Sequence, residues 1–475
     1  MERLSKIGQV LPKHSSQLAF SKIGIGFEKL DRAVFDPNKA YDKVAALGVK
    51  WVRLQSGWQR TEKVKGCYDF AWLDEIVDQL RARGCVPWLC LCYGNELYNP
   101  EAKTVFGAVG CPPIRNEDQK KGWHEYVRAL TAHFKGRVEW YEVWNEPEWT
   151  WKDEDLKIAG NGTEYGRFVV DTAAAVREGD PDAKVIGGSL CTSDMFFLHA
   201  ALEAGMGQVI DALTFHEYTP DERRVQDRVS WLRALTHRYN PNVRIIQGES
   251  GSQSRSDGCG AMSGGAWTPE KQAKQCVRHT VMDLMSDVYF TSFFTTVDMI
   301  EALMGRVGDK SSYLDYGYFG VLGADFDENG FSTGDYTPKP AYYALQTLCS
   351  VFGEAIENAV LPVSFRSNPS RRALGSDLPA LNVVSGGFRR PNGSYALAYW
   401  NPTDLMTTSY EGTTSLSLAG LPDDISLIDL KDGSVYRLPD SMISKQDGDC
   451  KFLLNLPIRD FPLLLTFGDF AEIQK

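Results

Sequence analysis

The stretch VEWYEVWNEPEW, residues 138–149, begins as an apolar run rich in strand-forming residues and ends in the polar cluster NEPE, residues 145–148. A second segment, EYGRFVVDTAAAVREG (164–179), follows it and has apolar residues at the spacing of a helix. Val, Trp and Tyr favour strands, and apolar residues every three or four positions favour an amphipathic helix. The stretch therefore predicts a strand followed by a helix, with polar side chains at the carboxyl end of the strand.

This strand-helix unit recurs along the chain. The apolar runs are continuous rather than alternating, as in strands that are covered on both faces, and helices end at turn signals such as Gly48 and Gly84. Eight consecutive units favour an α/β fold of the (β/α)8 TIM barrel type. A doubly wound open sheet is the alternative, although Lys29 breaks the dinucleotide fingerprint that would begin at Gly24. The eight predicted strands span residues 22–28, 49–55, 86–94, 138–144, 183–189, 211–218, 243–250 and 289–297.

After about residue 354, helical periodicity gives way to short alternating runs. The Asn-Gly and Asp-Gly pairs at 392–393 and 432–433 separate these runs and are typical of hairpin turns. We therefore expect a catalytic barrel over residues 21–354 and a smaller C-terminal antiparallel β-sandwich over residues 355–475. The N-terminal segment 1–20 precedes the first barrel strand and could pair with the sandwich.

Composition indicates a globular protein with an acidic surface. The 475 residues include 51 basic and 62 acidic ones, a net charge of −11 that argues against nucleic acid or a membrane surface as partner. The N-terminus lacks the apolar core of a secretory signal, so we expect a cytoplasmic location. The ten cysteines show neither a disulfide framework nor a CxxC pair, which favours reduced thiols. We expect no cofactor and no metal, and the sequence leaves open whether the chain forms a homo-oligomer.

Two glutamates stand at predicted strand ends, where the catalytic residues of such barrels lie. Glu146 follows the fourth strand and Glu249 ends the seventh. These strands lie nearly across the barrel mouth, so the two carboxylates can face each other over a pocket. Paired carboxylates perform glycoside hydrolysis, in which one donates a proton to the leaving oxygen and the other attacks the anomeric carbon.

Other strand-end residues are candidates for binding the substrate. Arg53 would lower the pKa of a nearby carboxylate, although it could instead form an internal salt bridge, and His216 could instead be a core histidine. Glu148 is expected at the rim and Glu217 in a structural role. Aromatic rings near the rim suit the apolar faces of sugars. The candidate substrate-binding set is Asn145, Arg53, His216, Tyr218, Gln55, Trp58, Asn95, Trp267 and Asp298. Tyr93, Thr295 and Thr296 also stand at strand ends, and Trp149 and Trp151 could be rim aromatics or ordinary loop packing.

The motifs WNEP (144–147), HEY (216–218) and GES (248–250) resemble those of clan A glycoside hydrolases. Within the clan the chain is most similar to family 39, the β-xylosidase and α-L-iduronidase type, through its barrel motifs, the segment TPKPAYYALQTL (337–348) and the terminal sandwich. The resemblance implies a retaining enzyme with Glu146 as acid/base and Glu249 as nucleophile. It further implies that Asn145 holds the sugar 2-hydroxyl and that Tyr218 hydrogen-bonds the nucleophile.

The chain departs from the family pattern at two places. Thr295 or Thr296 stands where many clan members have a Trp platform, for which Trp267 could substitute, and Gln55 stands where the family often has His. Both changes concern the choice of sugar rather than the reaction.

We therefore expect a retaining exo-glycoside hydrolase that acts on oligosaccharides or small glycosides, because long loops at 95–116, 250–267 and 298–336 can wall a pocket. The alternatives are an endo-acting clan A polysaccharide hydrolase and a catalytically silent carbohydrate-binding barrel. The retaining mechanism requires carboxylates ~5–5.5 Å apart, whereas an inverting pair would be ~6.5–9.5 Å apart.

Overall fold

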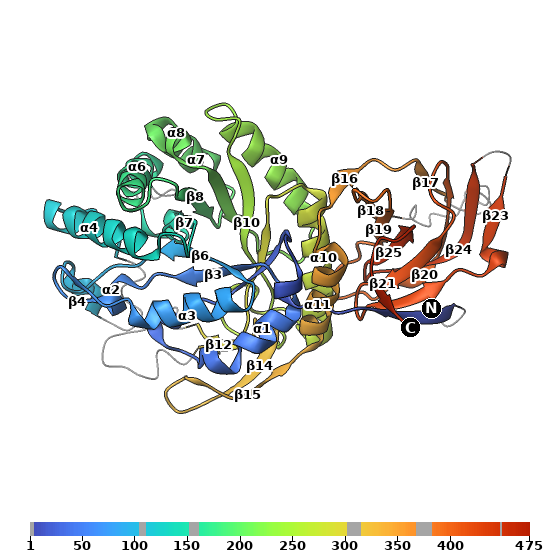
Figure 1. Ribbon diagram of the computed structural model, residues 1–475, viewed down its shortest axis with the longest axis horizontal. Coiled ribbons are helices and arrows are strands. Elements are labelled where there is room, and N and C mark those ends of the chain that lie inside the picture. Colours follow the sequence, from blue (N-terminus) through green and yellow to red (C-terminus); the bar gives the residue numbers. More distant parts are fainter. Residues whose placement is uncertain (1–3, 104–110, 152–160, 302–314, 367–381, 447–448) are drawn as a thin grey trace.

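A computed structural model of the chain describes residues 4–103, 111–151, 161–301, 315–366, 382–446 and 449–475. A helix-covered barrel forms one end of the molecule and a β-rich domain forms the other (Figure 1).

Eight parallel strands form a closed barrel, which confirms the predicted fold class. Their positions in the chain match the eight apolar runs, and β11 pairs with β2 to close the ring. The strands in chain order are β2 (Ile23–Gly26), β3 (Trp51–Gln55), β6 (Val86–Leu91), β7 (Trp140–Val143), β8 (Lys184–Leu190), β9 (Ala212–His216), β10 (Arg244–Ser250) and β11 (Thr291–Phe293).

Helices cover the outside of the barrel (Figure 1). Asn116, Asn161 and Thr268 cap the amino ends of three long helices with their side chains, as such residues do where a helix begins. The covering helices are α1 (Tyr41–Leu47), α3 (Ala71–Ala82), α4 (Glu117–Phe134), α6 (Gly162–Gly179), α7 (Met195–Ala201), α9 (Arg224–Thr236), α10 (Pro269–Met285) and α11 (Pro340–Phe352). Within the described ranges, no helix is both long enough and apolar enough to traverse a bilayer.

Short elements lie in the loops between the strands and these helices. They are the helices α2 (Trp58–Thr61), α5 (Pro147–Thr150) and α8 (Gly207–Val209), and the hairpins β4–β5 (Glu62–Val64, Cys67–Tyr68), β12–β13 (Met299–Ile300, Tyr316–Gly317) and β14–β15 (Leu322–Phe326, Ser332–Pro338).

The C-terminal part contains two antiparallel sheets with an apolar core of their own, in which Leu397, Leu416 and Leu465 are buried. The predicted hairpin turns are confirmed, since Gly393 and Gly433 connect paired strands at φ of +81° and +77°. The larger sheet has the order β16 (Glu357–Ala359), β18 (Val384–Arg389), β19 (Tyr395–Trp400), β25 (Leu463–Phe467), β21 (Ile425–Asp429), β22 (Ser434–Arg437), β1 (Ser5–Val10), β26 (Ile473–Gln474). The smaller has the order β17 (Val363–Arg366), β20 (Glu411–Leu418), β24 (Lys451–Arg459), β23 (Ile443–Lys445).

The N-terminal segment joins the two parts of the molecule. Its strand β1 pairs antiparallel with β22 of the larger sheet before the chain enters the barrel. Helices α10 and α11 are the barrel helices that face the sandwich (Figure 1).

Candidate active site

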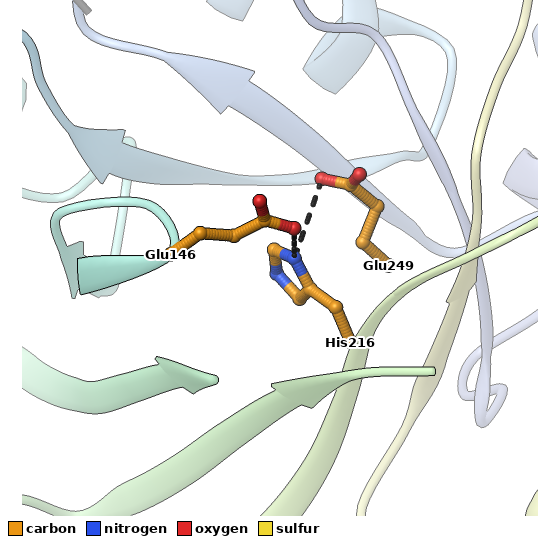
Figure 2. Close-up of side chains that lie close together, drawn as sticks. All are labelled: Glu146, His216 and Glu249. Atoms are coloured by element: carbon orange, nitrogen blue, oxygen red, sulfur yellow. Dashed lines mark hydrogen bonds and ion pairs between the residues drawn. The ribbon is translucent and has the colours of Figure 1, made fainter. Parts of the chain in front are cut away.

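Glu146 and Glu249 face each other at the carboxyl end of the barrel strands, with His216 beside them (Figure 2). One oxygen of each carboxylate and one His216 ring nitrogen all lie within 4.8 Å of one another. The side chains of Glu146 and Glu249 are 25% and 12% exposed, so both can reach a bound molecule. These two carboxylate oxygens are thus no more than 4.8 Å apart, which suits the close carboxyl groups of a retaining pair.

The backbone on either side of Asn145 has an unusual conformation. Trp144 and Glu146 both have positive φ values, +67° and +48°, which residues other than glycine adopt uncommonly. The Glu146 N–H donates to the Ser189 carbonyl on β8 at 3.1 Å, which holds this turn in place. Strained residues of this kind cluster at functional sites.

Burial controls the protonation of Glu146 and His216. His216 Nδ1 lies 2.9 Å from Glu146 Oε1, and its Nε2 lies 3.2 Å from Ser189 Oγ. Burial lowers the pKa of His216 to about 4, so the ring is neutral near pH 7. Burial also raises the pKa of Glu146 to about 7. Glu146 can therefore keep a proton near neutrality and exchange it easily, as a general acid/base must.

Glu249 has a hydrogen-bond donor at each carboxylate oxygen. Arg53 Nη1 donates to Oε2 at 2.7 Å, and the Tyr218 hydroxyl donates to Oε1. Donors and a positive charge stabilise the carboxylate form. Glu249 is therefore the better suited of the two glutamates to act as an ionised nucleophile.

Arg53 is wholly buried and connects several polar groups. Its Nε donates to Glu142 Oε2 and its Nη2 to Asn145 Oδ1, both at 2.8 Å. Burial alone would lower the pKa of Arg53, but the surrounding carboxylates raise it above its usual value. Arg53 therefore forms an internal ion pair with Glu142, one of the two roles considered for it, and it also contacts Glu249.

Two buried acids beside Arg53 were missing from the predicted set. Glu142 lies on β7, and Glu28 follows β2 with its Oε1 3.7 Å from Arg53 Nη1. Thr295 Oγ1 lies 3.0 Å from Glu28 Oε2, and burial raises the pKa of Glu28. An acid within a mostly apolar strand run, such as Glu28 in KIGIGFE and Glu142 in EWYEV, is the signal that could have found both.

Trp58 and Asn95, both predicted to bind substrate, make their described contacts within the protein. Trp58 is fully buried and stacks on Tyr126 of α4 with ring centroids 5.6 Å apart. Its Nε1 donates to Glu62 Oε2. Asn95 is 1% exposed, and its Nδ2 donates to the Glu62 carbonyl at 2.9 Å, so it fixes a loop.

Asp298 and Trp151 likewise make their described contacts within the protein. Asp298 Oδ1 accepts from Lys339 Nζ at 2.7 Å and from the Gly320 N–H at 2.9 Å, which organises the loop after β11. Trp151 is 1% exposed and packs on Tyr165. Trp149, by contrast, is 58% exposed.

In its described contacts, Trp267 does not form the aromatic platform for a sugar that was considered for it. It is 5% exposed, and its Nε1 donates to the Met262 carbonyl of its own loop at 2.7 Å. The hydroxyls of Thr295 and Thr296 donate to the Gly26 carbonyl. The aromatic ring at this strand end is Phe294, which packs edge-on against Tyr218 at 6.4 Å.

The amide of Gln55 bonds to neighbouring protein groups. Its Nε2 donates to the Tyr93 hydroxyl at 3.0 Å, and its Oε1 accepts from the Lys29 N–H at 2.9 Å and from Arg32 Nη2 at 2.6 Å. Gln55 and Tyr93 are only 6% and 4% exposed, so neither presents a large surface to a ligand.

Glu148 and Glu217 both form contacts within the fold. Glu148 accepts from the Thr192 N–H at 3.0 Å, and Glu217 pairs with Arg228. Glu148 is 5% exposed, so the expectation of a rim-facing side chain is wrong, whereas the structural role expected for Glu217 is confirmed.

Glu146, His216 and Glu249 also have the composition of a three-ligand metal set. A metal ion bound to Glu249 Oε2 would stand beside the Arg53 guanidinium, which already lies 2.7 Å from that oxygen. Since two cations repel at this distance, the residues fit acid/base chemistry better than metal binding.

A closed parallel barrel with glutamates facing each other from its fourth and seventh strands has the architecture of the clan A glycoside hydrolases. Residues 36–224 match the family described as Glycosyl hydrolases family 39. The matched region contains Arg53, Asn145, Glu146, His216 and Tyr218, and ends before Glu249.

Two relatives each match about a third of the chain. A beta-xylosidase from Geobacillus stearothermophilus is 31% identical over 172 residues, which are 33% of this chain and 32% of that protein. A beta-xylosidase from Caldicellulosiruptor saccharolyticus is 29% identical over 164 residues, or 32% of each. The matches thus span about a third of the length of these relatives.

Solved structures share the whole architecture at low identity. A family 39 glycoside hydrolase from Bacteroides cellulosilyticus WH2 superposes with a TM-score of 0.64 at 16% identity, over 96% of this chain and 83% of that one. A monomeric beta-xylosidase from Caulobacter crescentus CB15 gives 0.58 at 17% identity, over 97% of both. Residues 36–224 thus resemble glycosyl hydrolase family 39, as the motifs do, and the whole chain shares the fold of these solved structures.

Proposed function

We propose that the protein is a retaining glycoside hydrolase that works by double displacement. The facing pair of Glu146 and Glu249 supports this most directly, because the two side chains lie close together in opposite environments. Burial favours the protonated form of Glu146, while Arg53 and Tyr218 donate hydrogen bonds to the two carboxylate oxygens of Glu249. Two carboxyl groups with different environments and different roles are the pattern of glycosidases.

In the first step, Glu146 gives its proton to the glycosidic oxygen as the bond from that oxygen to the anomeric carbon breaks. A carboxylate oxygen of Glu249 attacks the anomeric carbon from the opposite face and forms a glycosyl ester. The aglycone leaves as an alcohol. In the second step, Glu146, now a carboxylate, takes a proton from water. The water oxygen displaces Glu249 and releases the sugar with its original anomeric configuration.

Asn145 is placed to contact the sugar. Arg53 can only donate hydrogen bonds, so Asn145 must turn its Oδ1 toward Arg53, as the 2.8 Å contact shows. Its Nδ2 protons then remain for a sugar hydroxyl. We assign this contact to the 2-hydroxyl, where bonds that strengthen in the transition state contribute most.

We propose exo action on small β-glycosides, with β-xylosides as the first class to test. Two relatives are described as beta-xylosidases. Hydrogen bonds also join the loop after β10 to the loop after β11. The Ser254 N–H donates to the Tyr318 carbonyl at 2.9 Å and the Cys259 N–H to the Tyr316 carbonyl at 2.8 Å. Long loops that are joined in this way favour a pocket that accepts a chain end over an open groove.

The decisive experiment has two parts. A panel of nitrophenyl β-xyloside, β-galactoside, β-glucoside, α-L-arabinoside and uronides identifies the sugar, with Glu249→Gln as the inactive control. Proton NMR of the first product then identifies its anomer, and we expect the anomer of the substrate. The opposite anomer would exclude the retaining mechanism.

The same assays separate the two alternatives. Internal cleavage of xylan before any monosaccharide is released would favour an endo-acting enzyme. Equal inertness of wild type and Glu249→Gln, with sugars still bound, would favour a silent carbohydrate-binding barrel.

We also propose a cytoplasmic location. The exposed Cys67 and Cys450 are both thiols, which suits a reducing compartment. Fractionation of the native host should place the protein with cytoplasmic markers, and recovery from the culture medium would contradict the proposal.

A further inference from the structure

We propose that the β-sandwich positions the nucleophile, through contacts that fix the loop of residues 217–223 between β9 and α9. This loop presents Tyr218 to Glu249. The inference rests on the proposed function, and it gives the second domain a role in the reaction.

His279 of α10 holds together the two backbone segments that bear Tyr218 and Glu249. Its Nε2 lies 2.8 Å from the Thr219 carbonyl, one residue after Tyr218. Its Nδ1 lies 3.3 Å from Ser250 Oγ, one residue after Glu249. Because a carbonyl only accepts, the ring proton is on Nε2, and Nδ1 accepts from the Ser250 hydroxyl.

The far end of the loop is held by the sandwich. Glu222 is 1% exposed, and its Oε1 accepts from Trp400 Nε1 at 2.7 Å. Trp400 ends β19 and is itself fully buried. An N–H group from the second domain thus satisfies a buried carboxylate in the first.

Arg278 connects the same helix to the sandwich. Its Nη1 lies 3.8 Å from Glu222 Oε2 and donates to the Thr403 carbonyl at 2.9 Å, while its Nε donates to the Asp460 carbonyl at 2.7 Å. Adjacent residues of α10 therefore hold the sandwich and the nucleophile region, since His279 follows Arg278 directly.

These contacts exceed what joining two domains requires. A well-packed apolar residue at position 222 would join them without burying a charge, and such replacements are often neutral or stabilising. The Glu222 carboxylate instead defines one position of the loop relative to Trp400. That position sets the Tyr218 hydroxyl against Glu249, and hydrogen bonds weaken steeply when their geometry is lost.

The test is the Trp400→Phe variant of the full chain, which keeps a buried ring but removes the N–H. We expect its rate of turnover, and its rate of inactivation by a 2-deoxy-2-fluoro glycoside at saturation, to fall about 10- to 100-fold. The inhibition constant of the product sugar should stay within twofold, because positioning affects the reaction rather than ground-state binding.

Lys274→Met is the matched control. Lys274 forms a 2.6 Å ion pair with Asp460 across the same interface, one turn from Arg278, and none of its described contacts reaches the loop of residues 217–223. The Lys274→Met variant should have a lower melting temperature but an unchanged rate of inactivation. A rate unchanged in Trp400→Phe, or an equal fall in Lys274→Met, would overturn the proposal.

Substitutions at Glu222 provide a second readout that does not depend on Trp400. Glu222→Gln keeps an oxygen that can accept from Trp400 and should retain most of the wild-type rate, whereas Glu222→Leu should show the same loss as Trp400→Phe. Equal rates in the two Glu222 variants would also overturn the proposal. Failure of the proposed function is distinguishable, because wild type would then be inert on every glycoside.

Discussion

Replacing Tyr218 with Phe removes one hydrogen bond to the nucleophile and changes little else. The hydroxyl donates to Glu249 Oε1, while the ring packs against Phe294 and Phe319 with centroids 6.4 and 6.1 Å away. Phe keeps those ring contacts. A hydrogen bond to a charged group contributes about 1.5–3 kcal/mol. If the bond serves the transition state, its loss should slow the reaction roughly 10- to 150-fold, at about 1.4 kcal/mol per tenfold change.

The assay compares kcat/KM and kcat of wild type and Tyr218→Phe on the best aryl glycoside of the panel. Tyr399→Phe makes the same chemical change in the sandwich, where the hydroxyl donates to the Pro457 carbonyl at 2.9 Å, and should leave both constants unchanged. A folded Tyr218→Phe enzyme with wild-type constants would refute the assignment of Tyr218 as a partner of the nucleophile.

Three further predictions concern Glu146 and Trp58. First, wild-type kcat/KM should fall above about pH 7, because burial raises the pKa of Glu146 to about 7 and only the protonated form can act as the acid; a pH profile without this limb would contradict the assignment. The same role of Glu146 predicts that azide restores turnover of an activated substrate in Glu146→Ala, and release of the free sugar alone would count against that role. Second, the folded state keeps the Glu146 proton between pH 4.5 and 7, while the unfolded state loses it, so stability falls as pH rises through this window. The difference in pKa of 2.5 (7 − 4.5) corresponds to about 3 kcal/mol of unfolding free energy. Urea unfolding of wild type and of Glu146→Gln at pH 4.5 and at pH 7 measures this change, and the same pH dependence in both proteins would exclude it. Third, Trp58→Ala should lose about 3–5 kcal/mol of stability because its ring is fully buried, and a raised KM in the folded variant would reinstate it as a substrate contact.

The barrel could be predicted from the sequence because its strands are short, apolar and regularly separated by helices. The same regularity located the reacting pair. Once a run is counted as the fourth or seventh strand, its terminal polar residue has a known place in the barrel. Glu146, His216, Tyr218 and Glu249 were found in this way, and the structure brings all four together.

The sequence did not predict the contacts of residues that lie beyond the ends of the strands. Trp58 and Asn95 stand three and four residues beyond their strands, where loop geometry decides the direction of each side chain. Gly57 adopts a φ of +62°, and the next residue begins α2 with its ring against α4. Nothing in the local sequence specifies that packing, because the partners Trp123 and Tyr126 lie more than sixty positions away.

Other contacts near the site were not predicted because the search considered only polar residues at the ends of predicted strands. A search for polar residues at strand ends cannot find Phe294, whose apolar ring packs on Tyr218. Glu28 satisfies the rule but follows the first strand, which did not enter the set of strand ends. The contacts between Trp400 and Glu222 join residues 178 positions apart, and no motif relates them.

The central claim is that Glu249 forms a covalent bond to the sugar. A 2-deoxy-2-fluoro glycoside of the preferred sugar should inactivate the enzyme by accumulating this ester, and protease digestion with mass spectrometry then locates it. The label should appear on the peptide that contains Gly248-Glu249-Ser250 and on Glu249 within it. A label on Glu28, Glu142 or Glu146 would contradict the account, as would turnover that gives the inverted anomer and leaves no labelled peptide.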